Sequence, residues 1–311
     1  MAEQKTVLIL SSPTGSGKTP VSLKVAEQVP VEIISADSRQ IYKYLTIGTA
    51  KPEQSEIESV PHHFIDSLEP DAPWNAGKFS QEARKIITEI FDREKIPFVV
   101  GGTGLYIKAL VDGIVDVPEV DLALRERISK RFEKEGLIVL VAELKKLDPV
   151  ASETIDLLNP RRVMRALEIY YMTGMTRAEI EKKSSDPLPY RVIWFGLNWE
   201  RGKLYQRIEQ RIDSMVERGL VDEVRSILEK GYSKHTNALQ SVGYAEAIDY
   251  IEGKINREEM VKRIKQNSRQ YAKRQMTWFR RDKRIRWIDI NSGDDLNKAA
   301  MFITEQYRKN V

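Results

Sequence analysis

The chain has 311 residues, 41% hydrophobic and 31% charged, which is enough for one large domain or two modest ones with a sizeable core. No stretch approaches the roughly 18 apolar residues of a membrane span, and residues 1–5 run directly into a predicted strand, so we expect neither a membrane segment nor a secretory leader. Cysteine is absent, which excludes disulfides and thiolate metal sites and fits a cytoplasmic protein.

The first predicted strand, residues 7–10, leads into a loop of small residues and then into a helix-like segment at 21–28. The loop has the composition and the Gly-Lys-Thr ending of a P-loop, in which backbone amides and a helix N-terminus hold phosphate. The motif predicts that Lys18 contacts phosphate and that the Thr19 hydroxyl ligates Mg²⁺. The predicted phosphate loop consists of Ser12, Pro13, Thr14, Gly15, Ser16, Gly17, Lys18 and Thr19.

Asp37 follows the second predicted strand, residues 31–35, and so lies at the sheet edge that also holds the P-loop. Two interpretations remain open. With Gln40 three residues later, Asp37 fits a helix-capping box. A carboxylate at this edge can also bind Mg²⁺ or accept a proton from a substrate.

The next predicted strand, residues 97–100, ends in Gly101, Gly102 and Thr103. Nucleotide-hydrolysing P-loop proteins usually have an Asp here that supports Mg²⁺, so the sequence argues against an ordinary ATPase or GTPase. The pair His62 and His63 does not predict a metal site, because adjacent side chains point apart on a strand.

The alternation of strands and helices stops near Asp116 and returns at Arg191. Only helical patterns lie between, bounded by the proline-containing segments 116–118 and 184–189. We therefore predict an α/β fold with a P-loop, parallel-sheet core at 1–115 and 190–311, and an all-helical insertion domain at 116–189. Within the second core segment we predict helices at 201–230 and 257–281.

Residues 201–286 carry an excess of Lys and Arg over Asp and Glu, much of it on the predicted helix 257–281. Such a basic helix with aromatic residues indicates contact with a nucleic acid, or simply a solvated surface. The same two interpretations apply to Arg161, Arg162 and Arg165 in the insertion.

Taken together, these motifs resemble the bacterial tRNA dimethylallyltransferases, also called tRNA isopentenyltransferases. The matching segments keep the family's order over nearly the whole chain: Pro13 to Thr19, Ser35 to Ser38, Ile47 to Pro52, Pro61 to His63, Gly101 to Thr103 with Leu105 and Tyr106, Arg165 to Glu168, Val242 to Tyr244, and Ala272 to Gln275 with Thr277 and Trp278.

The resemblance implies transfer of a dimethylallyl group from dimethylallyl diphosphate to N6 of the adenosine 3′-adjacent to the anticodon. It implies that the P-loop holds diphosphate with Mg²⁺, that Asp37 is the general base, and that Thr103 and Arg211 contact the diphosphate and the reacting centre. The partner would be the tRNA anticodon stem-loop. The implied tRNA contacts are Asp37, Ser38, Arg39, Gln40, Thr103, Arg125, Arg161, Arg162, Val163, Met164, Arg165, Gln240, Ser241, Val242, Gly243, Tyr244 and Ala245.

The sequence departs from the family pattern at four positions, which are Ser12, Gly15, Gln240 and Ala245. Two other functions remain open from the residues alone. One is a small-molecule P-loop kinase, and the other is a non-catalytic RNA-binding protein that retains a P-loop. We expect the protein to be a monomer.

Overall fold

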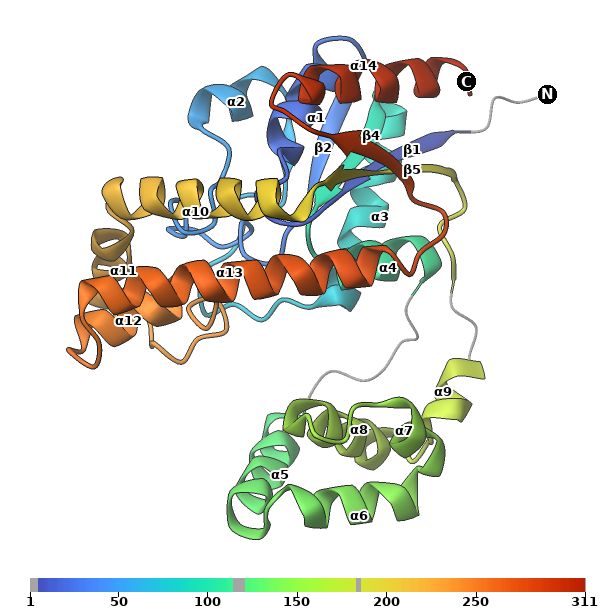
Figure 1. Ribbon diagram of the computed structural model, residues 1–311. Coiled ribbons are helices and arrows are strands. Elements are labelled where there is room, and N and C mark those ends of the chain that lie inside the picture. The colour runs from blue at the N-terminus through green and yellow to red at the C-terminus, as the bar shows by residue number, and fades with distance from the viewer. Residues whose placement is uncertain (1–4, 114–120, 183–185, 311) are drawn as a thin grey trace. The chain divides into compact units, whose positions relative to one another are not determined.

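The computed structural model describes residues 5–113, 121–182 and 186–310. The chain divides into a core unit, Met1–Val111 with Leu188–Val311, and an insertion unit, Asp112–Pro187 (Figure 1). The predicted linker at 116–118 lies outside the described residues, as do residues 184 and 185 of the second one.

The second core segment begins at Leu188, two residues before the predicted start at residue 190. The backbone N–H of Leu188 donates to the carbonyl of Val111 over 2.9 Å, and its side chain is buried with residues of the sheet and of helix α4, Gly104–Asp112. The two connections to the insertion therefore leave the core from one point.

The core unit is built on a six-stranded sheet, which confirms the predicted α/β class. Strand order is β3-β2-β4-β1-β5-β6, and every pairing is parallel. All carboxyl ends therefore lie at one edge, where ligands bind in open α/β sheets. The strands are β1 Thr6–Ser11, β2 Val31–Ala36, β3 His62–His63, β4 Ile96–Gly101, β5 Arg191–Trp199 and β6 Arg286–Ile290.

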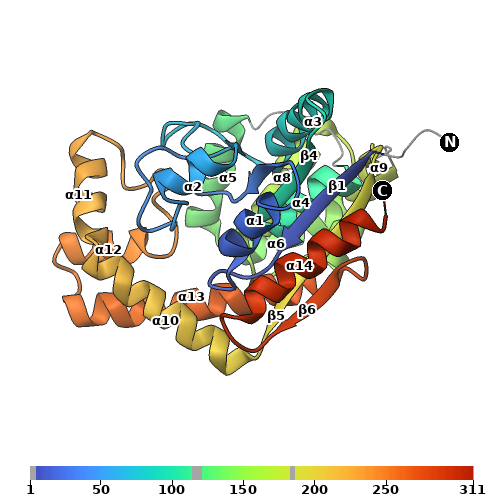
Figure 2. The ribbon, with the colours of Figure 1, turned by 90° about the horizontal axis from the view of Figure 1, so that it is seen from above.

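Helices cover both faces of the sheet, because alternate residues of the buried strands point to opposite sides. In β1, Leu8 and Leu10 pack on the side of α1, Lys18–Ala26, and α14, Asp295–Arg308, which lie side by side in Figure 2. Val7 and Ile9 pack on the other side, against α3, Ala76–Asp92, and against α4. Parallel strands buried on both faces are typical of this architecture.

Besides α14, the helices of the second core segment are α10 Arg201–Glu217, α11 Leu220–Glu229, α12 Tyr244–Ile251 and α13 Arg257–Phe279; a short α2, Gln54–Ser59, lies in the first segment. Helices α10 and α13 run side by side (Figure 1). Residues 201–230, predicted to be helical, form the two helices α10 and α11, which are separated at Gly219, whose φ of +97° is in the left-handed region that favours glycine.

The insertion unit is helical throughout its described elements, as predicted. Its helices are α5 Leu122–Glu135, α6 Leu137–Leu147, α7 Pro149–Thr154, α8 Pro160–Thr173 and α9 Arg177–Lys182. They enclose a small core of their own around Ile128, Leu140, Leu144 and Leu167. Across the described residues of both units, no helix is both long enough and apolar enough for a bilayer crossing.

Candidate active site

The loop between β1 and α1 adopts a conformation that its glycines make possible. Gly15 and Gly17 have φ values of +77° and +89°. A Cβ at Gly15 would lie 2.8 Å from the Ile208 side chain, and one at Gly17 would lie 2.9 Å from Leu296. Both positions therefore need glycine for their backbone angles and for the space around them.

This loop leaves a run of hydrogen-bond donors without acceptors. Within the described residues, the backbone amides from Gly15 to Thr19 have no partner, and neither does the buried hydroxyl of Ser16. Buried polar groups are normally paired, and amides that converge at a helix N-terminus are a site for an anion. The predicted phosphate loop thus has the donors that its function requires.

Lys18 lies against the loop with its ammonium group on the carbonyls of Ser12 and Pro13, at 2.9 Å from each. Burial lowers the pKa of Lys18 to about 8; the charge of Asp37 opposes that shift and the charge of Arg211 adds to it. The negative charge of an anionic ligand would raise the pKa of Lys18 again and so favour its cationic form.

Ser12, where the family usually has glycine, is accommodated through its hydroxyl. The Ser12 Oγ accepts from the backbone N–H of Leu197 over 2.6 Å and donates to the carbonyl of Ser11. The side chain is fully buried, so its contribution to the loop is structural. The Ser12 hydroxyl therefore does not occupy the unpartnered amides of Gly15 to Thr19.

Asp37 directly follows β2, at the carboxyl edge beside the loop. Its Oδ1 accepts from the backbone N–H groups of Arg39, at 2.8 Å, and Gln40, at 3.3 Å. No helix begins here, so the capping-box interpretation was wrong, and these bonds form a side-chain-stabilised turn instead. Oδ2 has no hydrogen-bond partner among the described residues. The carboxylate is oriented through one oxygen and available through the other.

Thr103 joins the ends of β2 and β4. Its backbone N–H donates to the carbonyl of Ala36 over 3.1 Å, and its Oγ1 accepts from the N–H of Ser38 over 3.0 Å. Gly101 allows this approach, since a Cβ there would lie 2.2 Å from the Ala36 oxygen. The turn that carries Asp37 is therefore fixed to the glycine-rich end of β4.

Arg211 extends from α10 toward the same place. Its Nη2 donates to the carbonyl of Thr49 over 3.2 Å. Burial lowers the pKa of Arg211, and the charge of Asp37 opposes that shift. The structure thus brings together the P-loop, Asp37, Thr103 and Arg211, the residues expected to bind the diphosphate and to carry the chemistry.

Sequence reasoning included Gln275 of α13 in a matching segment but gave it no role, and the structure shows that it joins two loops of the site. Its Oε1 accepts from the N–H of Thr14 over 3.0 Å, and its Nε2 donates to the carbonyl of Gly102 over 2.8 Å. The available signal was an amide side chain on the otherwise largely apolar face of the predicted helix 257–281.

Two residues near β5 and α10 also support the loop. Arg207 donates to the Gly15 carbonyl over 3.0 Å, and the Trp199 indole donates to the Ser16 carbonyl over 2.8 Å. These bonds bind the carbonyl oxygens of Gly15 and Ser16, and the N–H groups of the same loop remain available to a ligand.

Gln40 is engaged inside the protein. Its Oε1 accepts from Ser35 Oγ over 3.1 Å, and its Nε2 donates to the carbonyls of Thr49, at 3.3 Å, and Ala50, at 3.1 Å. In this structure its amide therefore supports a loop instead of facing outward. Arg39 has one spare group, because its buried Nη1 has no partner among the described residues.

The segment 240–245 is only partly at the surface. Tyr244 is fully buried, and its hydroxyl donates to Glu223 over 2.6 Å. Gly243 is buried as well, whereas Gln240 is exposed and Ser241, Val242 and Ala245 are half-buried. The expected surface contact for Tyr244 thus differs from its place in this structure, where the side chain is part of the core.

In the insertion unit the predicted tRNA-contacting arginines fall into two groups. Arg125 binds Glu168 through two bonds of 2.8 and 3.1 Å, and Arg165 adds a third of 3.1 Å. Burial raises the pKa of Glu168, but the bonds from these two arginines outweigh it and lower that pKa overall. Arg161 and Arg162 are exposed and have no ion pair among the described residues.

The two other positions predicted in this segment differ in exposure. Val163 is fully buried in the insertion core, and Met164 is half-buried. The Val163 side chain is therefore not at the surface in this structure, which corrects the contact expected for it.

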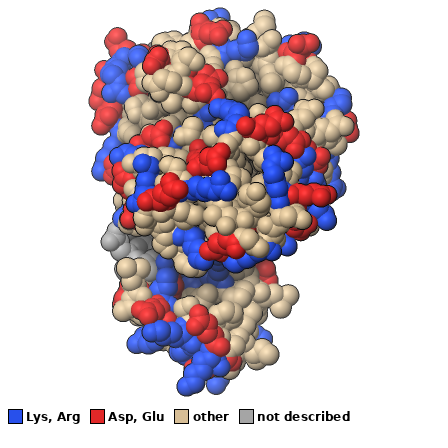
Figure 3. All heavy atoms as spheres, turned by 90° about the vertical axis from the view of Figure 1, so that its left-hand side faces the viewer, with Lys and Arg blue, Asp and Glu red and all other residues tan. Residues whose placement is uncertain are grey.

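The basic excess of residues 201–286 is partly neutralised. Lys265 pairs with Asp213 at 2.7 Å, and Arg269 pairs with Glu209. On the face drawn in Figure 3, Lys and Arg are interspersed with Asp and Glu. Part of the basic excess is therefore balanced by acidic side chains on the same surface.

No cluster of three or more His, Cys, Asp or Glu side chains suited to a metal occurs in the described parts of the chain. His63 instead binds the buried Glu32 at 2.8 Å. Mg²⁺ is commonly held by one or two protein oxygens with substrate phosphates and water. The Thr19 hydroxyl, which has no hydrogen bond in the described structure, fits that role beside the phosphate loop.

Comparison with known proteins gives consistent matches along the chain. Residues 40–282 match the family model described as IPP transferase. The chain is 44% identical over 302 residues to a tRNA dimethylallyltransferase of Carboxydothermus hydrogenoformans, covering 96% of each. It is 42% identical over 284 residues to that of Cytophaga hutchinsonii, covering 91% of this chain and 92% of the relative.

Solved structures agree with these matches. A tRNA isopentenylpyrophosphate transferase of Bacillus halodurans aligns with a TM-score of 0.72 and 36% identity, covering 99% of this chain and 98% of the other. A eukaryotic dimethylallyltransferase acting on tRNA aligns with a TM-score of 0.83 and 29% identity, covering 98% and 80%. Family model, relatives and P-loop geometry lead to one conclusion: the chain belongs to the IPP transferase family.

Proposed function

We propose that this protein transfers the dimethylallyl group of dimethylallyl diphosphate to N6 of the adenosine 3′-adjacent to the anticodon of tRNA, and releases diphosphate. One observation carries the proposal: the unpartnered donors of the P-loop, the carboxylate of Asp37 and the guanidinium of Arg211 occur together at one edge of the sheet. Membership of the IPP transferase family supports it.

The loop side of the site binds the leaving group. Breaking the allylic carbon–oxygen bond leaves negative charge on diphosphate, which the loop amides, Lys18 and Arg211 would stabilise. Thr103 lies at the same edge and contacts the reacting centre in this proposal. Thr19 would hold Mg²⁺, whose charge also offsets that of the diphosphate.

Asp37 acts on the other substrate. The N6 amine of adenine is a poor nucleophile because its lone pair is delocalised into the ring. The free Oδ2 of Asp37 accepts the N6 proton as the new carbon–nitrogen bond forms, a contribution of typically ~10²–10⁴-fold. To reach it, the adenine leaves its stack, which is least costly in a single-stranded loop.

Exposed residues supply the tRNA contacts in this proposal. Arg161 and Arg162 contact the phosphate backbone, with Gln240 contributing from the core unit. Ser38 and Arg39 line the position of the base beside Asp37. The protein acts as a monomer, which light scattering of the free and tRNA-bound chain would test.

One experiment separates this function from the alternatives. Purified protein is incubated with undermodified tRNA, Mg²⁺ and labelled dimethylallyl diphosphate, and a parallel reaction receives labelled ATP instead. We expect label in tRNA from the first reaction and no phosphate transfer in the second. If ATP is turned over and the tRNA acquires no label, a P-loop kinase is favoured. If tRNA binds and neither reaction transfers a group, a non-catalytic RNA-binding protein is favoured.

A further inference from the structure

The loop at residues 46–50, between β2 and α2, is fixed by a single carboxylate. The backbone N–H groups of Thr46, Ile47 and Gly48 all donate to Glu223, over 3.0, 2.6 and 3.1 Å. Three successive amides on one side chain form a strong set of charge-assisted hydrogen bonds. The conformation of this loop therefore depends on a residue of α11, which lies 175 positions away from Gly48 in the sequence.

Glu223 itself is held in place. It lies in the first turn of α11, where the helix dipole favours a negative charge. The hydroxyl of Tyr244 donates to its Oε1 over 2.6 Å. The Tyr244 ring packs so closely on Gly48 that a Cβ there would lie 2.4 Å from it. Four donors thus converge on this carboxylate, and none of them belongs to a ligand.

The far end of the same loop meets the active site. The carbonyl of Thr49 accepts from Arg211 Nη2 over 3.2 Å and from Gln40 Nε2 over 3.3 Å. Ala50, next in the chain, has a φ of +44°, an unfavourable conformation for alanine that the surrounding bonds maintain. The direction of the Thr49 carbonyl is therefore fixed on both sides.

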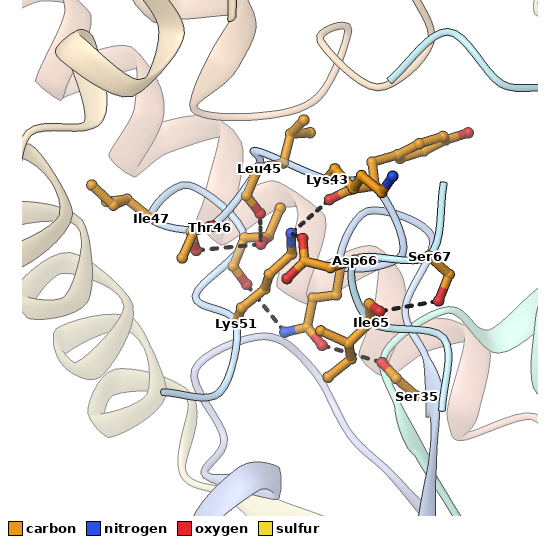
Figure 4. A network of polar contacts seen from close by, with 12 residues as sticks. Ser35, Lys43, Leu45, Thr46, Ile47, Lys51, Ile65, Asp66 and Ser67 are labelled. Carbon is orange, nitrogen blue, oxygen red and sulfur yellow. Dashed lines mark hydrogen bonds and ion pairs between the residues drawn. The ribbon is translucent and has the colours of Figure 1, made fainter. Parts of the chain in front are cut away.

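Lys51, which directly follows the loop, fixes its end. Its buried ammonium group donates to the Tyr42 carbonyl over 2.6 Å. It also pairs with Asp66 (Figure 4). Lys51 fixes the C-terminal end of the loop and Glu223 fixes its N-terminal end. The Thr49 carbonyl, which binds Arg211, therefore has little freedom to move.

We infer that Glu223 is a positioning residue for Arg211. It fixes the amides of residues 46–48, which sets the Thr49 carbonyl, and that carbonyl accepts a hydrogen bond from the Arg211 guanidinium and so fixes its position. The inference rests on the proposed role of Arg211 at the diphosphate. Glu223 touches no substrate in this scheme and acts only through the loop.

The test is a double-mutant cycle with Glu223→Gln and Arg211→Ala, read out by calorimetric binding of inorganic diphosphate and by kcat and KM for dimethylallyl diphosphate. Gln keeps the shape but presents an NH₂ group and no charge to the amides. We expect Glu223→Gln to weaken diphosphate binding and lower kcat/KM by roughly 10- to 100-fold in the wild-type background, and by less than about 2-fold when Arg211 is absent. The affinity for tRNA stays within about 2-fold.

Glu229→Gln provides the matched control, because Glu229 is exposed on the same helix, and its effect should be negligible. Equal losses in both backgrounds, or no loss from Glu223→Gln, would overturn the inference. If Glu223→Gln does not fold, Tyr244→Phe removes one donor from the carboxylate, and a loss of roughly 2- to 10-fold that vanishes without Arg211 is expected. If the wild-type protein binds diphosphate but transfers nothing, the proposed function is contradicted. The double-mutant cycle on diphosphate binding still tests the role of Glu223.

Discussion

The carboxylate of Asp37 uses only one of its two oxygens to hold the turn after β2. Oδ1 is bonded to the backbone of residues 39 and 40, and Oδ2 is left without a partner in the described structure. An amide in its place keeps the acceptor that forms the turn but cannot act as a base. The two roles can therefore be separated experimentally.

We expect Asp37→Asn to lower kcat by about 10²–10⁴-fold while the affinity for tRNA stays within a few-fold, because the turn survives and the base is lost. Single-turnover transfer with labelled dimethylallyl diphosphate and a filter-binding assay measure the two quantities. Asp37→Ala, which also loses the turn, is the comparison. Near-normal turnover in the Asn variant would remove Asp37 from the chemistry.

Lys18 predicts a pH dependence of diphosphate binding. Its pKa in the free protein is about 8, so the protonated, cationic form that attracts diphosphate is lost as the pH rises through that value. We expect kcat/KM for dimethylallyl diphosphate to fall above pH 8 with that apparent pKa.

Lys18→Arg is the matched variant, because arginine stays charged throughout this range. Its kcat/KM is lower at pH 7 but should not show the decline above pH 8. A wild-type profile that stays flat from pH 7 to pH 9 would contradict this assignment.

At the scale of elements, helix α13 links the P-loop to the loop after β4 through the side chain of Gln275. We expect Gln275→Leu to lower the free energy of unfolding by about 1–3 kcal/mol, since the Thr14 N–H and the Gly102 carbonyl lose their partner. The KM for dimethylallyl diphosphate should also rise, because the first part of the P-loop is no longer fixed.

Urea denaturation and steady-state kinetics check both parts of this prediction. Gln270→Leu is the control, since Gln270 is exposed on the same helix. If both variants behave alike, the bridge between the two loops is of no consequence.

The sequence predicted those elements that local patterns determine. The buried strands, the P-loop with its following helix, and the place of Asp37 all follow from short stretches of the chain. The roles of Gln275 and Glu223 could not be found in this way. The partners of Gln275 lie 261 and 173 positions away in the sequence, and the loop partners of Glu223 lie 175 to 177 positions away.

At the scale of the whole molecule, the insertion unit can be tested by removal. Val111 and Leu188 are joined by a backbone hydrogen bond of 2.9 Å, so a short Gly-Ser linker between them should leave the core unit folded. We expect this deletion of residues 112–187 to retain diphosphate binding, measured by calorimetry, and to lose most affinity for tRNA. Loss of diphosphate binding despite a cooperative thermal transition would contradict this division of roles.

The exposed arginines of the insertion give a finer test in the complete chain. We expect Arg161→Ala with Arg162→Ala to weaken tRNA binding and to reduce the slope of log K against log salt by roughly 2, about 1 for each phosphate contact. Lys298→Ala on α14 is the control. An unchanged slope would return both arginines to a solvated surface.

The hydrogen bond between Val111 and Leu188 has a consequence for how such a chain can evolve. A segment whose two ends meet at neighbouring backbone positions can enter or leave a gene in one event without moving any strand. Recombination can then exchange the helical insertion unit among relatives while the sheet of the core unit is inherited intact.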